Sequence, residues 1–191
     1  MSIVRLAAPA LAGVLLLTGC SDFAGTGDLD YVPGQGNVTE VAPEDRDDPV
    51  GVSGETVQGD PLDLADLRGQ VVVVNVWWSL CGPCRTEMPM LVEAEADLPA
   101  DETAFVGINI RDAAPENAAA FERDLDVTYP SIYDPGSETL DEFGRYRPSS
   151  MPATAILDRE GRVAALISGE VPSKTTLVTI VEDLLEEDAD G

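Results

Sequence analysis

The chain has 191 residues and a formal net charge of −25, from 36 Asp and Glu against 11 Lys and Arg. A chain this acidic lacks the basic surface that phosphate binding requires, so we exclude nucleic acid as a partner. The absence of histidine from the sequence excludes Ser-His-Asp hydrolysis, Cys-His proteolysis and His-ligated zinc. The remaining chemistry depends on thiols, carboxylates or backbone groups.

The N-terminus has the pattern of a secretion signal. Arg5 precedes an apolar run from Leu6 to Leu17 that is too short to span a bilayer. The run leads into Leu-Thr-Gly-Cys ending at Cys20, which is similar to the lipobox of bacterial lipoproteins, where the cysteine is acylated. We expect a lipoprotein signal peptide at residues 1–19 and a lipid anchor on Cys20. The alternative is an ordinary cleaved signal that contains a cysteine.

The segment after the signal is polar. Residues 20–50 have no hydrophobic period and are rich in Gly, Asp, Pro and Glu. This composition predicts a disordered, acidic linker that is anchored through Cys20. The folded domain is expected at residues 51–191.

The first half of this domain alternates between strands and helices. The apolar run from Val71 to Trp78 is rich in β-branched residues, as in a strand covered on both faces. A helix is expected from Cys84 to Leu98, and a second buried strand from Thr103 to Ile110. A helix from Pro115 to Leu125 and an extended piece from Tyr129 to Asp134 follow.

The second half predicts a hairpin between two helices. A short helix is expected from Ser137 to Phe143, with Gly144 as its C-cap. The strands Thr154 to Leu157 and Arg162 to Ile167 are separated by turn residues, as in a hairpin. Ser173 caps a last helix whose apolar residues recur at helical spacing. The whole pattern indicates an α/β fold with a mixed central sheet and helices on both faces.

Two cysteines are candidates for redox chemistry. With Cys20 assigned to the lipid, Cys81 and Cys84 remain, separated by the loop residues Gly82 and Pro83. A disulfide that closes so short a loop restricts the unfolded chain little, so a reactive dithiol is favoured over a structural staple. The pair lies where a buried strand meets a helix, and the helix N-terminus favours a thiolate on Cys81. Thiol–disulfide exchange requires that thiolate.

Two segments resemble a known family. The segment from Asn75 to Pro89, NVWWSLCGPCRTEMP, resembles the active-site segment of the thioredoxin superfamily, and more narrowly its membrane-tethered branch that includes TlpA and ResA. The segment from Ser150 to Thr154, SMPAT, is similar to the family's Pro-Thr segment. The resemblance covers roughly Val50 to Asp188. It implies a thioredoxin-like fold with an inserted strand and helix in the middle.

The resemblance also implies roles for the residues around the dithiol. Cys81 is then the nucleophile and Cys84 the resolving cysteine, while Glu87 occupies the place of the acidic residue that tunes the pair. A carboxylate three residues after Cys84 lies about one helical turn away, and if buried it can take and return a proton. The alternative is a solvated surface glutamate. Thioredoxin has a buried Asp at the position of Asn75, so the neutral amide leaves Glu87 as the base.

A proline and several apolar residues complete the implied site. Pro152 is expected to be a cis proline opposite the dithiol, exposing the backbone of Met151 to an incoming chain. The alternative is a proline that starts a strand. Trp77 matches the family's inner aromatic and is a candidate for the active-site loop and substrate contact, but a core position is favoured for both Trp77 and Trp78. Leu80 stands where the family often has Trp, which reduces stacking on a substrate.

The function implied by the resemblance is extracytoplasmic thiol–disulfide exchange by a lipid-anchored monomer at the outer face of the cell membrane. The substrates are protein disulfides or dithiols, with the haem-binding cysteine pair of apocytochrome c as the first candidate. Generic protein-disulfide repair or oxidation is the next candidate, and the motif does not separate the two, because reduction potentials in the superfamily depend on small differences around the pair. The electrons come from a membrane donor of the thiol-reductant transporter type. The chemistry uses the dithiol Cys81–Cys84 alone, so we expect no separate cofactor and no metal.

Two other function classes also use cysteine thiols. A thiol peroxidase requires Pro-x-x-x-Thr-x-x-Cys, and neither Cys81 nor Cys84 has Thr three and Pro seven positions earlier. A non-enzymatic redox or metal-binding module is compatible with two thiolates, which can hold a soft ion such as Cu(I). The chain has no Met-rich segment to assist such a site, and a turnover assay separates binding from catalysis.

Overall fold

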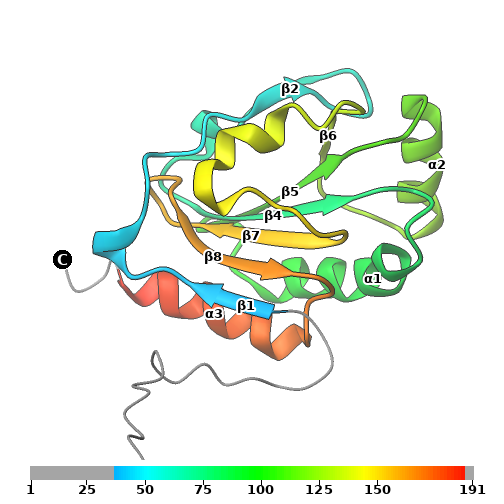
Figure 1. Cartoon of the computed structure of the whole chain (residues 1–191). Coiled ribbons are helices and arrows are strands. Elements are labelled where there is room, and N and C mark those ends of the chain that lie inside the picture. Colours follow the sequence, from blue (N-terminus) through cyan, green and yellow to red (C-terminus); the bar gives the residue numbers. More distant parts are fainter. Residues whose placement is uncertain (1–36, 188–191) are drawn as a thin grey trace, which may run out of the picture. The chain divides into compact units, whose positions relative to one another are not determined.

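The computed structural model describes residues 37–187. The predicted signal peptide at 1–19, the lipid-bearing Cys20 and the linker up to residue 36 lie outside the described residues. The described part contains a six-stranded sheet with the strand order β1-β8-β7-β4-β5-β6 and a separate two-stranded sheet, β2-β3 (Figure 1). Among residues 37–187, no helix is long and apolar enough to traverse a bilayer.

The central strand is β4 (Val71–Trp77), and all of its residues are buried. It pairs in parallel with β5 (Thr103–Asn109) and antiparallel with β7 (Ala153–Leu157). A strand with a neighbour on each side and a covered face above and below needs apolar side chains in both directions. This position explains the continuous apolar run and confirms the predicted buried strand.

The outer strands make the sheet mixed. On one side, β6 (Ser131–Tyr133) is parallel to β5. On the other side, β8 (Val163–Ser168) is antiparallel to β7, and β1 (Asn37–Glu40) is antiparallel to β8. The predicted hairpin is therefore confirmed as β7–β8. The predicted inserted strand and helix are also present, because α2 (Pro115–Asp124) and β6 lie between β5 and β7 in the chain.

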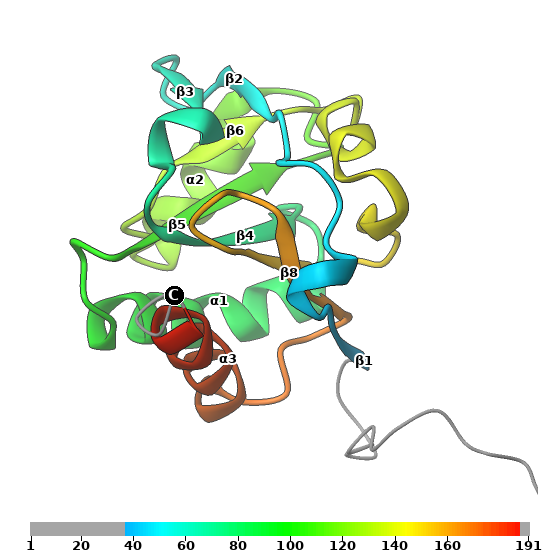
Figure 2. The same cartoon turned by 90° about the vertical axis from the view of Figure 1, so that its left-hand side faces the viewer.

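The two faces of the sheet are covered differently. One face packs against α1 (Gly82–Asp97), α2 and α3 (Lys174–Glu187), through a core that includes Trp77, Leu91 and Leu177 (Figures 1 and 2). The opposite face packs against the 3-10 helices η2 (Leu64–Leu67) and η3 (Thr139–Tyr146). Successive residues of β4 alternate between these two cores, as the pleat of a strand requires. Helices on both faces are thus confirmed.

The short helix expected at residues 137–143 differs in type and extent. It is the 3-10 helix η3, and the chain passes through Gly144 at a φ of 53° and continues to Tyr146. A second short element, the hairpin of β2 (Ser53–Glu55) and β3 (Pro61–Asp63), was not predicted. At the last helix, Ser173 Oγ accepts a hydrogen bond from the Thr176 N–H at 3.0 Å, which confirms the predicted cap.

The predicted boundary at residue 51 is too late. Residues 37–40 form β1, which adds to the edge of the main sheet, and η1 (Pro43–Asp45) follows. Val50, assigned to the linker from the sequence, is 1% exposed and belongs to the core. The polar pattern misled the prediction because three of the four residues of this edge strand are exposed and need no apolar side chain.

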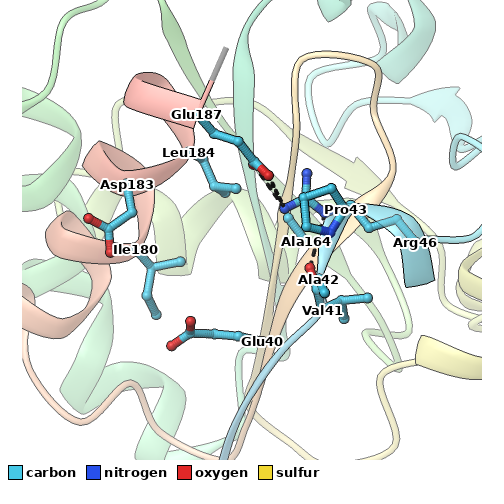
Figure 3. A pocket seen from close by; sticks show the side chains of 10 residues that line it. All are labelled: Glu40, Val41, Ala42, Pro43, Arg46, Ala164, Ile180, Asp183, Leu184 and Glu187. Carbon is cyan, nitrogen blue, oxygen red and sulfur yellow. Dashed lines mark hydrogen bonds and ion pairs between the residues drawn. The ribbon is translucent and has the colours of Figure 1, made fainter. Parts of the chain in front are cut away.

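Arg46 holds the segment after β1 against the rest of the domain. Its Nε donates to the Val41 carbonyl at 3.1 Å, and its guanidinium pairs with Asp158 at 3.1 Å and with Glu187 at 2.9 Å. Figure 3 shows Arg46 and Glu187 closing one end of a cavity of about 470 Å³ between α3 and this segment. The cavity contains no cysteine among its lining residues. Because the Arg46 side chain is nearly buried, we assign it a structural role in attaching the N-terminal segment.

Candidate active site

The two cysteines lie at the N-terminus of α1. Cys81 is the N-cap residue, and its sulfur accepts a hydrogen bond from the Cys84 N–H at 3.1 Å. The two sulfurs form a disulfide. Cys81 is 8% exposed and Cys84 is fully buried. The first sulfur is therefore both the more accessible one and the one that a backbone N–H of the helix stabilises as an anion.

The loop between the cysteines is open to solvent. Gly82 and Pro83 are both exposed and form the first turn of α1. Proline is tolerated there because the first N–H groups of a helix have no partner within the helix. An approaching chain can therefore reach Cys81 across this loop without displacing core residues.

Glu87 is buried beneath the cysteines on the same helix, with only 4% of its surface exposed. One carboxylate oxygen accepts a hydrogen bond from Asn75 Nδ2 at 3.0 Å, and the other accepts one from the Val171 N–H at 3.0 Å. Burial raises the pKa of Glu87 from its usual value of 4.5 to about 7, although the two hydrogen bonds act in the opposite direction. The alternative of a solvated surface glutamate is wrong.

Asn75 connects this carboxylate to the sheet. It lies in the middle of β4, directly opposite Thr154 of β7. Its Nδ2 group donates to Glu87 and also to the Thr154 hydroxyl at 3.1 Å. Its Oδ1 atom is buried without a hydrogen-bond partner. The amide therefore acts as a donor to the buried carboxylate, which favours the ionised form of Glu87.

The proline segment lies at the same end of the sheet as the dithiol. The Met151–Pro152 peptide bond is cis, as predicted. Ala153, the next residue, pairs with Val76 near the end of β4, from which the active-site loop departs. Met151 is half-buried and packs against the core that contains both cysteines. Within residues 37–187, its backbone N–H and C=O make no hydrogen bond.

The loop after β8 contacts both parts of the site. The Gly169 N–H donates to the Pro152 carbonyl at 3.0 Å. Two residues later, the Val171 N–H donates to Glu87. Glu170 lies between them, and its negative charge contributes to the raised pKa of Glu87. One short loop therefore fixes both the proline segment and the buried carboxylate.

A second buried carboxylate supports the active-site loop from the other side. Asp112 accepts hydrogen bonds from the backbone N–H of Ser79 at 3.1 Å and from the Ser79 hydroxyl. The Asn109 side chain donates to the same carboxylate at 2.7 Å. The residues before Cys81 are thus attached to the end of β5.

The two tryptophans occupy different environments. Trp77 is fully buried, stacks on Phe121 with ring centroids 4.9 Å apart, and donates through Nε1 to Ser131 Oγ at 3.1 Å. The core position favoured for Trp77 is therefore confirmed, and its candidate substrate contact is wrong. Trp78 is half-buried, and Leu80 is 76% exposed immediately before Cys81.

Several supporting residues were not identified from the sequence. The bonding role of Asn75, the Val171 N–H and the Asp112 carboxylate all depend on contacts between distant segments. Val171 contributes a backbone group, for which the sequence contains no signal. Asp112 follows the carboxyl end of a buried strand close to the dithiol strand, a position that could have marked it as a candidate.

Within residues 37–187, no group of three or more Cys, Asp or Glu side chains is arranged to hold a metal ion. The groups around the two sulfurs are instead a buried carboxylate, an amide and backbone donors. Such an arrangement can stabilise a thiolate and move a proton.

Comparison with known proteins agrees with this geometry. The family model described as Redoxin matches residues 39–185. The thiol:disulfide interchange protein HelX of Rhodobacter capsulatus is 30% identical over 151 residues, which cover 78% of this chain and 77% of HelX. The thiol-disulfide oxidoreductase ResA of Bacillus subtilis is 28% identical over 117 residues, which cover 60% of this chain and 62% of ResA.

A solved structure gives the same picture for the fold. A secreted thiol-disulfide isomerase from Corynebacterium glutamicum superposes with a TM-score of 0.73 and 30% sequence identity. The superposition covers 84% of this chain and 98% of that protein. The thioredoxin-like arrangement predicted from the sequence is therefore confirmed.

Proposed function

Because the chain belongs to the Redoxin family and is a thiol–disulfide oxidoreductase, we propose that Cys81 and Cys84 exchange disulfides with protein substrates outside the cytoplasm. The observation that carries this proposal is the placement of the Cys81–Cys84 disulfide at the N-terminus of α1, above a buried glutamate. The helix end stabilises the attacking thiolate, and the glutamate accepts the proton of the less accessible thiol.

The reduced enzyme begins the cycle. The Cys81 thiolate attacks one sulfur of a substrate disulfide, the substrate S–S bond breaks, and the released substrate thiolate takes a proton. Cys84, as a thiolate, then attacks the Cys81 sulfur of the mixed disulfide and releases the second substrate thiol. Two electrons pass to the substrate, and the enzyme is left with its Cys81–Cys84 disulfide. A dithiol donor restores the reduced enzyme by the same exchange in reverse.

Glu87 supports the second attack. The buried Cys84 must lose its proton before it can attack, and a carboxylate one turn away, with a pKa of about 7, can accept that proton near neutral pH. The proton returns when the disulfide is reduced again. Asn75 and the Val171 N–H hold the carboxylate in place throughout.

Substrate docking uses the proline segment. The unpaired backbone of Met151 can form strand-like hydrogen bonds with an extended substrate chain. Pro152 keeps that backbone at the dithiol end of the sheet. We place the haem-binding cysteine pair of apocytochrome c first among substrates, as the resemblance to the ResA branch implies, and a membrane dithiol transporter as the electron donor. We expect the protein to act as a monomer.

A turnover assay tests the activity. We expect full-length protein in detergent, supplied with a dithiol reductant, to reduce a protein disulfide catalytically. Cys81→Ser should be inactive, while Cys84→Ser should stop after the first attack and accumulate mixed disulfides that can be isolated from the native host. The third cysteine provides the control, because Cys20→Ala should remain active. Stoichiometric binding without turnover would instead support the binding-module alternative.

The membrane anchor is a separate part of the proposal. The lipobox-like sequence ending at Cys20 supports acylation of that residue, and the secreted relative supports an extracytoplasmic location. A lipidated protein should fractionate with membranes, and Cys20→Ala should release an active, soluble protein. Continued membrane attachment of this variant would contradict the anchor without affecting the assigned redox chemistry.

A further inference from the structure

A groove of about 390 Å³ is lined by Leu80, the residue immediately before the attacking Cys81. Its walls come from the residues just before Cys81, from α1, and from α2 together with the turn that precedes α2. A substrate joined to Cys81 in a mixed disulfide comes close to Leu80, because Leu80 is bonded to Cys81 in the chain. The groove is therefore placed to receive the substrate residues that flank the substrate's own cysteine.

The groove offers apolar surface. Leu80 is 76% exposed. Within residues 37–187, it is the one large hydrophobic residue with an exposed side chain. Trp78, which is half-buried, contributes aromatic surface to the same groove, whereas Phe121 also lines it but is only 2% exposed. The free energy of a complex falls when an apolar side chain of the substrate covers the exposed Leu80 and the exposed part of Trp78.

The groove also offers positive charge. Arg85 and Arg111 both line it, and no carboxylate among residues 37–187 pairs with either guanidinium. Arg85 instead lies over the Phe121 ring, 4.6 Å from its centroid. In a chain with more than three acidic residues for each basic one, two arginines that make no ion pair within residues 37–187 are available for an anionic group.

The acidic residues of the groove do not neutralise these arginines directly. Asp112 is 3% exposed, and its oxygens already accept hydrogen bonds from Ser79 and Asn109. Asp124 is exposed and lies near the end of α2. The negative charge on the rest of the molecule is screened beyond roughly 8 Å at physiological ionic strength. Within the groove, Arg85 and Arg111 are therefore the charged side chains that can donate hydrogen bonds to a bound carboxylate.

We propose that this groove is the specificity site for the substrate and selects polypeptide segments that carry an apolar side chain and a carboxylate next to the attacked cysteine. The proposal rests on the disulfide exchange assigned above to Cys81. The apolar side chain covers Leu80 and Trp78, and the carboxylate pairs with Arg85 and Arg111. Exposed ion pairs and partial apolar burial are each modest, so the site adjusts substrate preference without being required for catalysis.

A panel of peptide disulfides tests this preference. The peptides are identical except for two residues beside the reactive cysteine, which are Leu-Glu, Leu-Gln, Leu-Lys or Ser-Glu. Dithiothreitol supplies the two electrons of each turnover to full-length protein in detergent. We expect kcat/KM to be highest for Leu-Glu and about three- to tenfold lower for Leu-Lys and for Ser-Glu.

Variants separate the two parts of the preference. In Arg85→Gln/Arg111→Gln, the advantage of Leu-Glu over Leu-Lys should fall about three- to tenfold. In Leu80→Ser, the advantage of Leu-Glu over Ser-Glu should fall instead. Arg123→Gln is the matched control, because Arg123 is an exposed arginine of α2 that does not line the groove, and it should leave both ratios unchanged.

The outcomes distinguish this proposal from the one on which it rests. If wild-type protein reduces none of the peptides, the assigned activity has failed. If all peptides are reduced at equal rates, or if Leu-Lys is preferred, the activity stands and the proposed specificity is wrong. Sedimentation of the wild type and of the groove variants tests a second copy as occupant, since dimerisation that the variants abolish would also overturn the proposal.

Discussion

Asn75 Nδ2 lies 3.0 Å from Glu87 Oε1, in a part of the core where neither side chain is more than 4% exposed. The amide belongs to the central strand and the carboxylate to the helix that begins at the dithiol. A buried carboxylate with only two hydrogen-bond donors is poorly solvated, which explains why its pKa rises to about 7 despite those donors. The contact thus connects the strand, the helix and the proton chemistry of the site.

Glu87→Gln should change the pH dependence of the dithiol. In the wild type, Glu87 ionises as the pH rises through about 7, and its negative charge then disfavours a thiolate on Cys84 while allowing proton transfer from the thiol. We expect an inflection near pH 7 in the alkylation rate of the reduced protein, and its loss in Glu87→Gln. Glu93→Gln, an exposed residue of the same helix, is the control. An identical titration in the wild type and Glu87→Gln would remove Glu87 from the mechanism.

The same residue should make stability depend on pH. The pKa of Glu87 is about 7 in the folded protein and 4.5 when it is unperturbed, so between these values the folded state binds a proton that the unfolded state releases. The free energy of unfolding therefore falls as the pH rises from 4.5 to about 7. The decrease amounts to at most about 3 to 4 kcal/mol, at about 1.4 kcal/mol for each pH unit.

The comparison that isolates this effect is the difference between the wild type and Glu87→Gln. Urea unfolding of the oxidised proteins at several pH values should give a wild-type free energy that decreases more steeply with pH than that of the variant. Glu122 also has a raised pKa because of its burial, so both proteins retain some slope in the same direction. Parallel curves for the two proteins would contradict the raised pKa of Glu87.

Asn75→Ala should raise the pKa of Glu87. Removal of a hydrogen bond to the ionised carboxylate favours the neutral form, so the pKa of Glu87 should rise above about 7. Carbon-13 NMR of the glutamate carboxyl in the oxidised protein measures this directly. Thr154→Val is the control, because it removes the other side-chain acceptor of the same amide and leaves the bond to Glu87 in place. A Glu87 titration that is unchanged in Asn75→Ala would exclude this role.

The site was predictable where its chemistry is local in the sequence. Cys81, Cys84 and Glu87 lie within two turns of one helix, so their spacing alone placed them together. Pro152 needed the family resemblance, because an X–Pro bond is seldom cis and the sequence carries no general signal for it. The Val171 N–H, which donates to Glu87, lies 84 residues away in the sequence and is a backbone group that any residue except proline would supply. No pattern of side chains indicates such a contact.

The fold was predictable where burial imposes a pattern. β4 is covered on both faces, and its sequence is an almost continuous apolar run. β1 lies at an edge of the sheet and is mostly exposed. The polarity of β1 therefore resembles that of a linker, although the strand is part of the sheet. The same effect hid the β2–β3 hairpin, whose outer residues are exposed. Trp77 was ambiguous because an aromatic residue next to an active-site loop suits either the core or a substrate contact.

Gly107→Ala should loosen the packing behind the active-site loop. A Cβ atom at this position of β5 would lie 2.1 Å from Ser131 Oγ and 2.7 Å from Trp77 Nε1, the two atoms of the hydrogen bond that orients the indole. Both side chains are buried, so neither can move away freely, and we expect a loss of about 1–3 kcal/mol in the free energy of unfolding. Urea unfolding followed by tryptophan fluorescence measures this loss.

Gly82→Ala is the control, because a Cβ there would meet nothing within 4 Å. The free energy of unfolding of this variant should change by less than about 1 kcal/mol. Equal midpoints for the two variants would show that the Trp77–Ser131 contact does not require glycine at position 107.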